Sequence, residues 1–201
     1  MDTLTQEKAR ISAGNSKLGN IPNISLTPVK ACGNCSACAS KCYALKAYRQ
    51  YPATKAAWDH NLKLAFRDRD AFFLSVHEYL SSRPVKRFRW HVSGDILDQD
   101  YLDRMSALAR IHEGTRFLAF TKMHNLDYSQ APENLEIVFS MFPGMPEPTA
   151  SWFPIIRKAW YQDGTETRIP ANAKKCPGSC ENCKACFTLS KQGRDVWFKA
   201  H

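Results

Sequence analysis

Two short runs of cysteine, one near each end of the chain, constrain this sequence more than any other feature. The first run has the spacing Cys-x2-Cys-x2-Cys-x3-Cys, and the second has the same gaps in reverse order, Cys-x3-Cys-x2-Cys-x2-Cys. Thiols spaced so closely hold either a disulfide framework or a metal centre, and the redox compartment decides between the two. Together the runs contain all eight cysteines of the chain: Cys32, Cys35, Cys38, Cys42, Cys176, Cys180, Cys183 and Cys186.

The cellular compartment is predicted from the lack of a recognisable signal peptide and of a membrane-spanning segment. Residues 1–20 are polar and carry no apolar stretch typical of a signal peptide. No apolar run approaches the roughly 18 residues that a membrane-spanning helix needs. We therefore expect a cytoplasmic protein that does not enter the membrane, in which cellular reductants keep thiols reduced. Metal ligation is then the favoured interpretation of the cysteines, and disulfide pairing is the minor one.

The spacing of each run favours an iron–sulfur cluster over zinc. Structural zinc sites usually combine two Cys-x2-Cys pairs separated by a dozen or more residues, whereas each run here is continuous. A 2-2-3 spacing is that of bacterial ferredoxins, which bind [4Fe–4S] clusters. The second run contains Cys-x3-Cys-x2-Cys, a spacing that radical SAM enzymes use for a cluster with one open iron. We expect one [4Fe–4S] cluster shared by both runs or two separate clusters, with zinc as the alternative metal.

The positive charge of the chain lies at its two ends, together with the cysteines. Residues 1–50 contain 7 Lys and Arg against 2 Asp and Glu, and residues 173–201 contain 6 against 2. Residues 51–172 contain 15 of each sign, so the net charge of +9 comes from the ends alone. These cations either offset thiolates around a metal or form a basic surface for nucleic acid. No nucleic-acid motif accompanies them, which favours the first interpretation.

The middle of the chain alternates predicted strands with predicted helices. Apolar stretches predict strands at 23–26, 87–95, 115–122, 135–142 and 151–160, the last weakened or placed at an edge by Pro154. Helical spacing predicts helices that end near Arg49, begin near Pro52, and cover 70–82 and 98–112. This order predicts an α/β fold, either a partial (β/α) barrel or an open, mostly parallel sheet with crossover helices. A full eight-unit barrel needs about 250 residues.

Three parts of the chain follow from this pattern. Residues 1–20 are expected to form a flexible polar N-terminus. Residues 21–172 are expected to form the α/β core, which includes the first cysteine run. Residues 173–201 form a C-terminal cysteine-rich segment that we expect to pack on the core, so that cysteine-rich segments flank the sheet at both ends.

Several motifs together resemble the phage gene product 88 family. They are "NSKLGNIPNISL", the unit Cys-x5-Cys-x3-Cys-Tyr-Ala, "FRWHVSGDILDQDYLDRM", "FLAFTK" and the final cysteine-rich block. The resemblance covers most of the chain from about Asn15, and "HVSGD" with "FTK" is its most specific part. It implies a viral origin and a metal–cysteine protein. Because the segment between Cys32 and Cys38 varies in the family pattern, it implies Cys32, Cys38 and Cys42 as ligands ahead of Cys35.

A more distant likeness connects the chain with radical SAM enzymes, in which a strand-end turn binds the cofactor's methionine amine. Ser93, Gly94 and Asp95 occupy the matching place, at the carboxyl end of a predicted parallel strand, where α/β folds bind ligands. Lys122 ends the next strand on the same side, and His91 lies two residues before Ser93. The Gly-Gly-Glu turn and the expected cysteine order are absent, so SAM remains a minor alternative. The likeness implies Gly94 and Asp95 as cofactor-binding residues, and the shared position at the strand ends makes His91, Ser93, Asp95 and Lys122 the catalytic candidates.

Structural roles compete for the same residues. Asp95 can serve as a turn or cap residue, Lys122 as a solvated loop residue, and His91 as a buried core histidine. A Ser-His-Asp triad is disfavoured because alternate residues of one strand do not bring the three groups within hydrogen-bonding reach, and no Gly-x-Ser-x-Gly elbow is present.

Three functional hypotheses follow. The first is an iron–sulfur enzyme, radical SAM-like or hydrolytic, whose substrate is a small molecule or a nucleic acid. The second is a module that binds nucleic acid or a host protein and uses the cluster as a structural staple. The third is a zinc protein with the same layout. The expected location is the cytoplasm of an infected cell.

Overall fold

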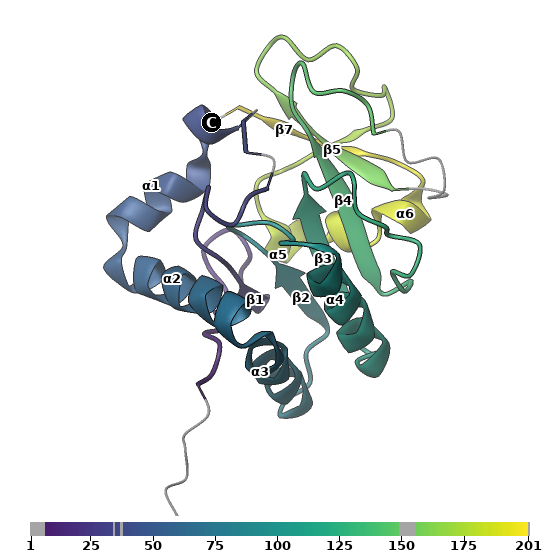
Figure 1. Cartoon of the computed structure of the whole chain (residues 1–201). Coiled ribbons are helices and arrows are strands. Elements are labelled where there is room, and N and C mark those ends of the chain that lie inside the picture. Colours follow the sequence, from purple (N-terminus) through teal and green to yellow (C-terminus); the bar gives the residue numbers. More distant parts are fainter. Residues whose placement is uncertain (1–6, 34, 37, 149–155, 201) are drawn as a thin grey trace, which may run out of the picture.

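The protein is an open parallel α/β sheet, seen in a computed structural model that describes residues 7–33, 35–36, 38–148 and 156–200. Seven strands form one sheet in the order β1-β2-β3-β4-β5-β7-β6, and every neighbouring pair is parallel (Figure 1). The predicted α/β class with an open parallel sheet is therefore confirmed. The strands are β1 Asn23–Ile24, β2 Arg87–Trp90, β3 Arg116–Thr121, β4 Leu135–Met141, β5 Arg157–Gln162, β6 Lys174–Lys175 and β7 Val196–Lys199.

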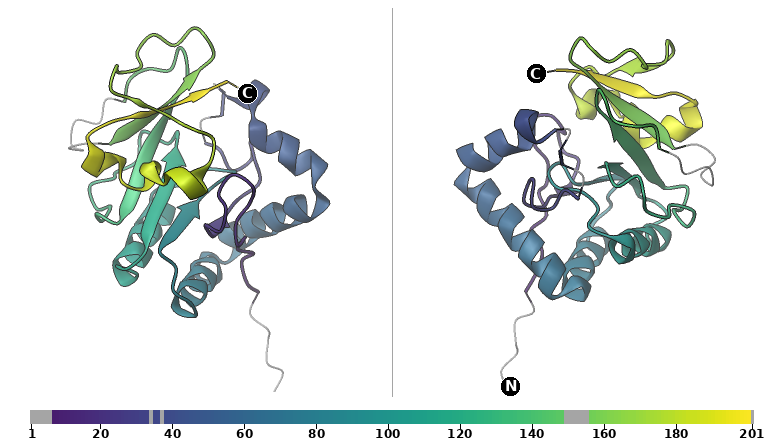
Figure 2. Two further views of the ribbon diagram at one scale, coloured as in Figure 1. Left: turned by 180° about the vertical axis from the view of Figure 1, so that it is seen from behind. Right: turned by 45° about the horizontal axis from the view of Figure 1, so that its top comes forward.

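The helices cover the two faces of the sheet unequally. The longer helices α2, α3 and α4 lie on one face, and the short helices α5 and α6 lie on the opposite face (Figures 1 and 2). The α-helices are α1 Tyr43–Gln50, α2 Pro52–Arg67, α3 Arg69–Ser81, α4 Gln99–Ile111, α5 Cys180–Cys183 and α6 Leu189–Gln192, and the 3-10 turns are η1 Ala39–Lys41 and η2 Ala185–Phe187.

Local sequence signals explain where the longer helices begin. Pro52 occupies the first turn of α2, where its missing N–H would have had no partner in any case. The Asp68 side chain accepts a hydrogen bond from the N–H of Ala71 and caps α3. The Asp98 side chain caps α4 in the same way by accepting from the N–H of Tyr101. The predicted break at Pro52 and the predicted cap at Asp98 are both confirmed.

The two larger of three apolar clusters join the sheet to the helices on its two faces. The larger cluster joins the sheet to α2, α3 and α4, and its fully buried aromatic side chains are Phe72, Phe88, Trp90, Tyr101, Phe117 and Tyr128. The cluster on the opposite face consists of Leu18, Ile21, Leu118, Val138, Ala159, Phe187, Leu189 and Val196. Adjacent strand residues such as Phe117 and Leu118 enter different clusters, because strand side chains alternate between faces.

Two predicted strand boundaries are wrong. The strand predicted for 87–95 ends at Trp90, because His91 adopts a φ of 55° and Gly94 a φ of 88°, which end the extended conformation. The strand predicted for 151–160 is observed as β5, which begins at Arg157 and lies between β4 and β7, so it is not an edge strand. Pro154, on which the edge assignment depended, lies outside the described residues.

The described part of the N-terminal segment is packed on the sheet, in contrast to the flexible tail expected for 1–20. Leu18 is 1% exposed and belongs to the second apolar cluster. Ser12 forms a β-bridge with Asn23, and the Asn61 side chain hydrogen-bonds to the backbone of Arg10. Residues 1–6 lie outside the described residues. Within the part of the chain that the structure describes, no helix is long and apolar enough to cross a membrane.

Candidate metal centres

The first cysteine run forms the loop between the end of β1 and the start of α1. The N–H of Cys32 donates to the carbonyl of Val29 at 3.1 Å, and the N–H of Cys38 donates to the carbonyl of Cys35 at 3.1 Å. Cys42 is the N-terminal cap residue of α1. Because β1 is parallel to its neighbours, this N-terminal cysteine group (Cys32, Cys35, Cys38 and Cys42) lies at the carboxyl edge of the sheet, where α/β proteins bind ligands.

A buried ion pair lies beside the N-terminal cysteine group. The Lys122 ammonium is 3.2 Å from Oδ2 of Asp95, and the same carboxylate accepts the backbone N–H of Lys122 at 3.0 Å. The Asp95 side chain is fully buried, and the Lys122 side chain is 11% exposed. The structure thus brings together two of the predicted site residues and joins the ends of β2 and β3.

Electrostatics keep Lys122 positively charged. Burial acts to lower the pKa of Lys122, but the charge of Asp95 and the nearby Cys38 and Cys32 outweigh it and hold this pKa above its usual value. Burial also raises the pKa of Cys32 to about 11, against the opposing effect of Lys122, and it raises the pKa of Cys38. These sulfurs are therefore protonated at neutral pH when no metal is bound, and a metal must displace their protons.

The other predicted residues at the end of β2 take up separate positions. Nε2 of His91 lies 3.1 Å from the hydroxyl of Tyr101, and burial lowers the pKa of His91 to about 4, so its ring is neutral. Gly94 has a φ of 88°, and a Cβ atom there would lie 2.7 Å from Cβ of Leu26, so the backbone itself requires glycine. The Ser93 hydroxyl is buried without a hydrogen-bond partner among the described residues.

His124 is a strand-end residue that sequence reasoning missed. It follows β3, its ring stacks on Phe139 at a centroid distance of 4.5 Å, and its Nε2 is buried without a hydrogen-bond partner in the described part of the chain. Burial lowers the pKa of His124, with Asp95 acting in the opposite direction. Its position two residues after Lys122, just beyond a predicted strand, could have identified it as a candidate. Polar atoms of His124, Ser93 and Lys122 therefore lie at the same sheet edge.

The second cysteine run folds into a compact group on the opposite face of the sheet. This C-terminal cysteine group (Cys176, Cys180, Cys183 and Cys186) lines one small hollow together with Ser179, Lys184, Ala185 and Phe187. The N–H of Cys180 donates to the carbonyl of Lys17 at 2.8 Å, and a Cβ atom at Gly19 would lie 2.3 Å from the side chain of Glu181. The N-terminal segment and the C-terminal cysteine group therefore hold each other in place.

The two cysteine groups lie against different parts of the core. Cys176, Cys180 and Cys186 pack against the second apolar cluster, whereas Ala31 and Met123, which flank the N-terminal group, belong to the first. The sequence left a shared site and two separate sites open, and in the structure the two groups contact different apolar clusters. All eight cysteines are free thiols of intermediate exposure. Among the described residues, no three or more Cys, His, Asp or Glu side chains are grouped closely enough to hold a single metal ion.

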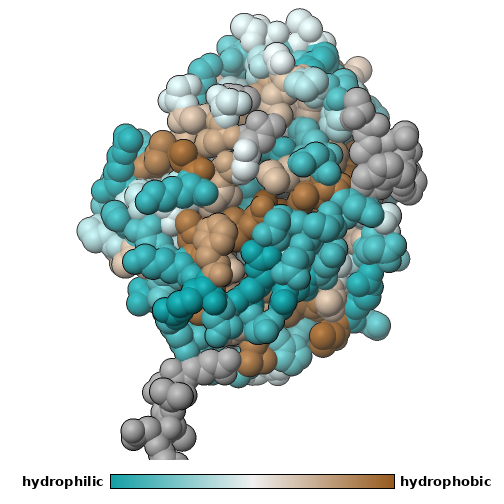
Figure 3. Space-filling model, in the orientation of Figure 1, coloured by the Kyte–Doolittle hydropathy of each residue, from teal (hydrophilic) through white to brown (hydrophobic). Residues whose placement is uncertain are grey.

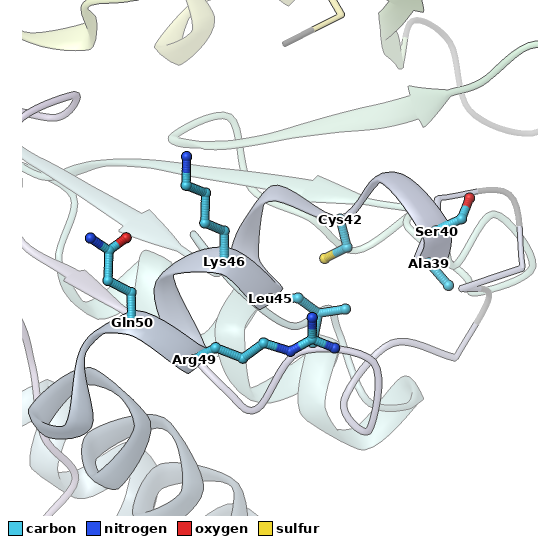
Figure 4. A pocket seen from close by; sticks show the side chains of 7 residues that line it. All are labelled: Ala39, Ser40, Cys42, Leu45, Lys46, Arg49 and Gln50. Atoms are coloured by element: carbon cyan, nitrogen blue, oxygen red, sulfur yellow. The ribbon is translucent and has the colours of Figure 1, made fainter.

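An open hollow with basic side chains adjoins the N-terminal cysteine group. Figure 4 shows the residues that line it, which are Ala39, Ser40, Cys42, Leu45, Lys46, Arg49 and Gln50. All of them come from η1, α1 and the residue between them. Hydrophilic residues cover most of the face drawn in Figure 3, with smaller apolar areas between them. The lining combines the polar side chains of Lys46, Arg49 and Gln50 with apolar ones such as Leu45 and Ala39.

Comparison with known families shows to which family the chain belongs. The sequence profile described as Gene product 88 matches residues 2–188. The chain belongs to the gene product 88 family. The matched segment contains both cysteine groups, Lys122 and Asp95, and it confirms the resemblance predicted from the "HVSGD" and "FTK" motifs. No curated protein and no solved structure matches the chain.

Proposed function

We propose that this family member is an iron–sulfur protein with two [4Fe–4S] centres, one for each cysteine group, and that the N-terminal centre forms part of an active site. The observation that carries the proposal is that the eight free thiols lie in two runs of four: the first adjoins the buried Lys122–Asp95 pair, and the second lines one small hollow. Soft thiolate donors select iron–sulfur clusters or zinc. The 2-2-3 spacing of the first run favours the cluster.

The fit of a cluster rests on charge as well as on the donors. A four-thiolate centre is anionic, and anions held in a partly buried site need nearby positive charge. Lys122 supplies a positive charge beside the N-terminal group, and its ion pair with Asp95 holds it in position. When bound, a cluster supplies electron transfer or, at an incompletely ligated iron, a Lewis acid. Cys32, Cys38 and Cys42 are the first choice of ligands, with Cys35 as the fourth.

The side chains at the sheet edge suggest how a substrate would be held. The Lys122 ammonium suits a carboxylate or phosphate oxygen of a small anionic substrate, or an anionic group of a nucleic acid. The Ser93 hydroxyl and Nε2 of His124 are buried polar atoms without partners among the described residues, so they are available to orient the same molecule. His91 is neutral and held by Tyr101, and we assign it a supporting role rather than proton transfer.

The open hollow beside Cys42 supports a second candidate function. Lys46 and Arg49 line it together with Gln50, and such a basic surface suits a nucleic-acid backbone or an acidic host protein. In this alternative the cluster is a structural staple and the sheet edge performs no reaction. We place either function in the cytoplasm of an infected cell, where free thiols persist.

Anaerobic purification of the full chain tests the proposal. We expect a brown protein that contains iron and acid-labile sulfide in equal amounts, with visible absorption that bleaches on reduction. A colourless protein loaded with zinc would overturn the cluster assignment. Addition of SAM to the reduced protein, followed by electron paramagnetic resonance, separates the subtypes: a changed spectrum indicates an open iron, and an unchanged spectrum contradicts the radical SAM-like role.

A further inference from the structure

The carboxylate of Asp59 on α2 holds the chain on both sides of the first cysteine run. Its Oδ1 atom accepts hydrogen bonds from the hydroxyl groups of Thr27 and Tyr48, each at 2.7 Å. Thr27 lies shortly before the run, and Tyr48 lies shortly after it in α1. Both ends of the segment that contains the N-terminal cysteine group therefore meet at a single oxygen atom.

The Asp59 carboxylate is ionised, which strengthens these contacts. Burial acts to raise the pKa of Asp59, but the hydrogen bonds from Lys55 and from the two hydroxyl groups outweigh it and lower this pKa to about 2. Hydrogen bonds to an ionised acceptor are stronger than those between neutral groups. The Lys55 ammonium donates to Oδ2 of Asp59 at 2.8 Å, and because both residues belong to α2, this contact holds neither end of the cysteine segment.

On the first side, Thr27 anchors the turn that leads to Cys32. Thr27 is buried, and its carbonyl accepts the N–H of Ala31 at 3.1 Å. The N–H of Cys32 donates to the carbonyl of Val29, also at 3.1 Å. Val29 has a φ of 66°, an unfavourable conformation for a β-branched residue that persists only where the surroundings fix it. The position of Cys32 therefore depends on how firmly Thr27 is held.

On the second side, Tyr48 holds α1, the helix that Cys42 caps. Ala44 is the only buried residue of this eight-residue helix, so apolar packing contributes little to its position. Polar contacts attach it instead. The Tyr43 hydroxyl donates to the carbonyl of Val92 at 2.5 Å near the start of α1, and the Tyr48 hydroxyl donates to α2 near its end. The position of Cys42 therefore depends on these contacts.

We infer that the Asp59 carboxylate closes the segment that bears the N-terminal cysteine group and so prepares this group to bind a metal. The inference rests on the proposed function, and it assigns Asp59 a positioning role because Asp59 acts through Thr27 and Tyr48. Among the described residues, no three of the sulfurs are grouped closely enough to hold one metal ion, so binding must draw the segment together at a cost in conformational entropy. A segment whose ends already meet loses less entropy, and its affinity for the metal is higher.

Titration of the metal-free full chain with cobalt(II) tests the inference, because thiolate-to-cobalt charge-transfer absorption reports binding by the sulfurs. Replacement of the C-terminal cysteine group by serine restricts the signal to the N-terminal group. We expect Thr27→Val and Tyr48→Phe each to weaken cobalt binding about tenfold, which corresponds to one hydrogen bond to a charged group. Tyr48→Phe keeps the ring that stacks on Trp58 of α2, with the ring centroids 6.4 Å apart.

The double variant and two controls separate closure of the segment from a general contribution to folding. The double variant is expected to lose about tenfold as well, because either single change already opens the segment. Thr27→Ser keeps the hydroxyl group and is expected to retain the parent affinity. Lys55→Met, the matched control, removes the partner of Asp59 that holds neither end of the segment, and it is expected to leave the affinity unchanged.

Several results would overturn the inference. It fails if the single variants bind cobalt as tightly as the parent, if Lys55→Met weakens binding equally, or if the double variant loses about a hundredfold, as two independent contacts would. The same changes in a chain that keeps only the C-terminal cysteine group should leave its cobalt binding unchanged, and a loss there would show a general effect on folding instead. Equal binding by all variants contradicts the role of Asp59 alone, whereas a parent chain that binds no cobalt through the N-terminal group contradicts the metal-binding role proposed for that group as well.

Discussion

The buried Lys122–Asp95 pair gives the account its most quantitative prediction. In Lys122→Met, the carboxylate of Asp95 loses the ammonium at 3.2 Å while it remains fully buried. Removal of one partner from a buried ion pair typically destabilises a protein by about 3–5 kcal/mol, because the other charge remains uncompensated. Lys122 is only 11% exposed, so solvent screening reduces this figure little. We therefore expect Lys122→Met to lower the free energy of unfolding by about 3 kcal/mol.

A double-mutant cycle on the metal-free full chain measures this effect by urea denaturation. Lys122→Met, Asp95→Asn and the double variant are compared, and Lys8→Met serves as the control because the Lys8–Glu78 pair is exposed. We expect the double variant to recover about 2 kcal/mol relative to the sum of the single changes, since no unpaired charge remains. The control is expected to change stability by less than about 1 kcal/mol. Additive single changes would refute the reasoning.

Two further predictions concern the end of β2. Burial lowers the pKa of His91 in the folded chain to about 4, whereas an unfolded histidine has a pKa of about 6.5. The unfolded chain therefore binds a proton between these values that the folded chain does not. The free energy of unfolding is highest above pH 6.5 and falls by about 3 kcal/mol between pH 6.5 and 4. Denaturation of the metal-free chain across this range measures the loss, and His91→Gln should flatten the profile; an unchanged profile would contradict the assignment. Gly94→Ala should destabilise by about 3 kcal/mol through positive φ and contact with Leu26, whereas Gly144→Ala, with a φ of 81° but open space around it, should lose only about 1 kcal/mol. Equal losses in thermal unfolding would show that crowding at Gly94 is not the cause.

The sequence predicted those parts of the fold that local chemistry determines. Pro52 marks the start of α2 and Asp98 caps α4, because a missing N–H and a capping carboxylate act within one helical turn. The strand at 135–142 was predicted within one residue of β4 because it is buried along nearly its whole length. The pairing of Asp95 with Lys122 was foreseeable, since the carboxyl ends of parallel strands meet at one edge.

Other features depend on contacts that no local pattern contains. β2 ends at Trp90 because His91 adopts a positive φ, and the strand-like sequence around His91 does not predict this conformation. The segment before β1 is polar apart from a few residues, and the burial of Leu18 depends on the C-terminal cysteine group that covers it. Arg89 has the position of an ordinary outward residue of an alternating strand, yet it is only 8% exposed, and its guanidinium lies 4.8 Å from the centroid of the Phe120 ring.

The spacing of the cysteines likewise does not predict where the two runs lie in the fold. The equal and reversed spacings left one shared site and two separate sites open, and the fold attaches the two runs to different parts of the sheet. The first follows β1 at the carboxyl edge of the sheet, and the second is held by Lys17 and Gly19 on the face opposite α2, α3 and α4.

Iron content of run-specific variants tests the central claim most directly. The full chain, a variant with Cys32, Cys38 and Cys42 changed to Ser, and a variant with Cys180, Cys183 and Cys186 changed to Ser are reconstituted anaerobically and assayed for iron and sulfide. Two independent [4Fe–4S] centres predict about eight irons per parent chain and about four in each variant. Loss of all iron from either variant while it remains folded would contradict two independent centres, and zinc in place of iron would contradict the cluster itself.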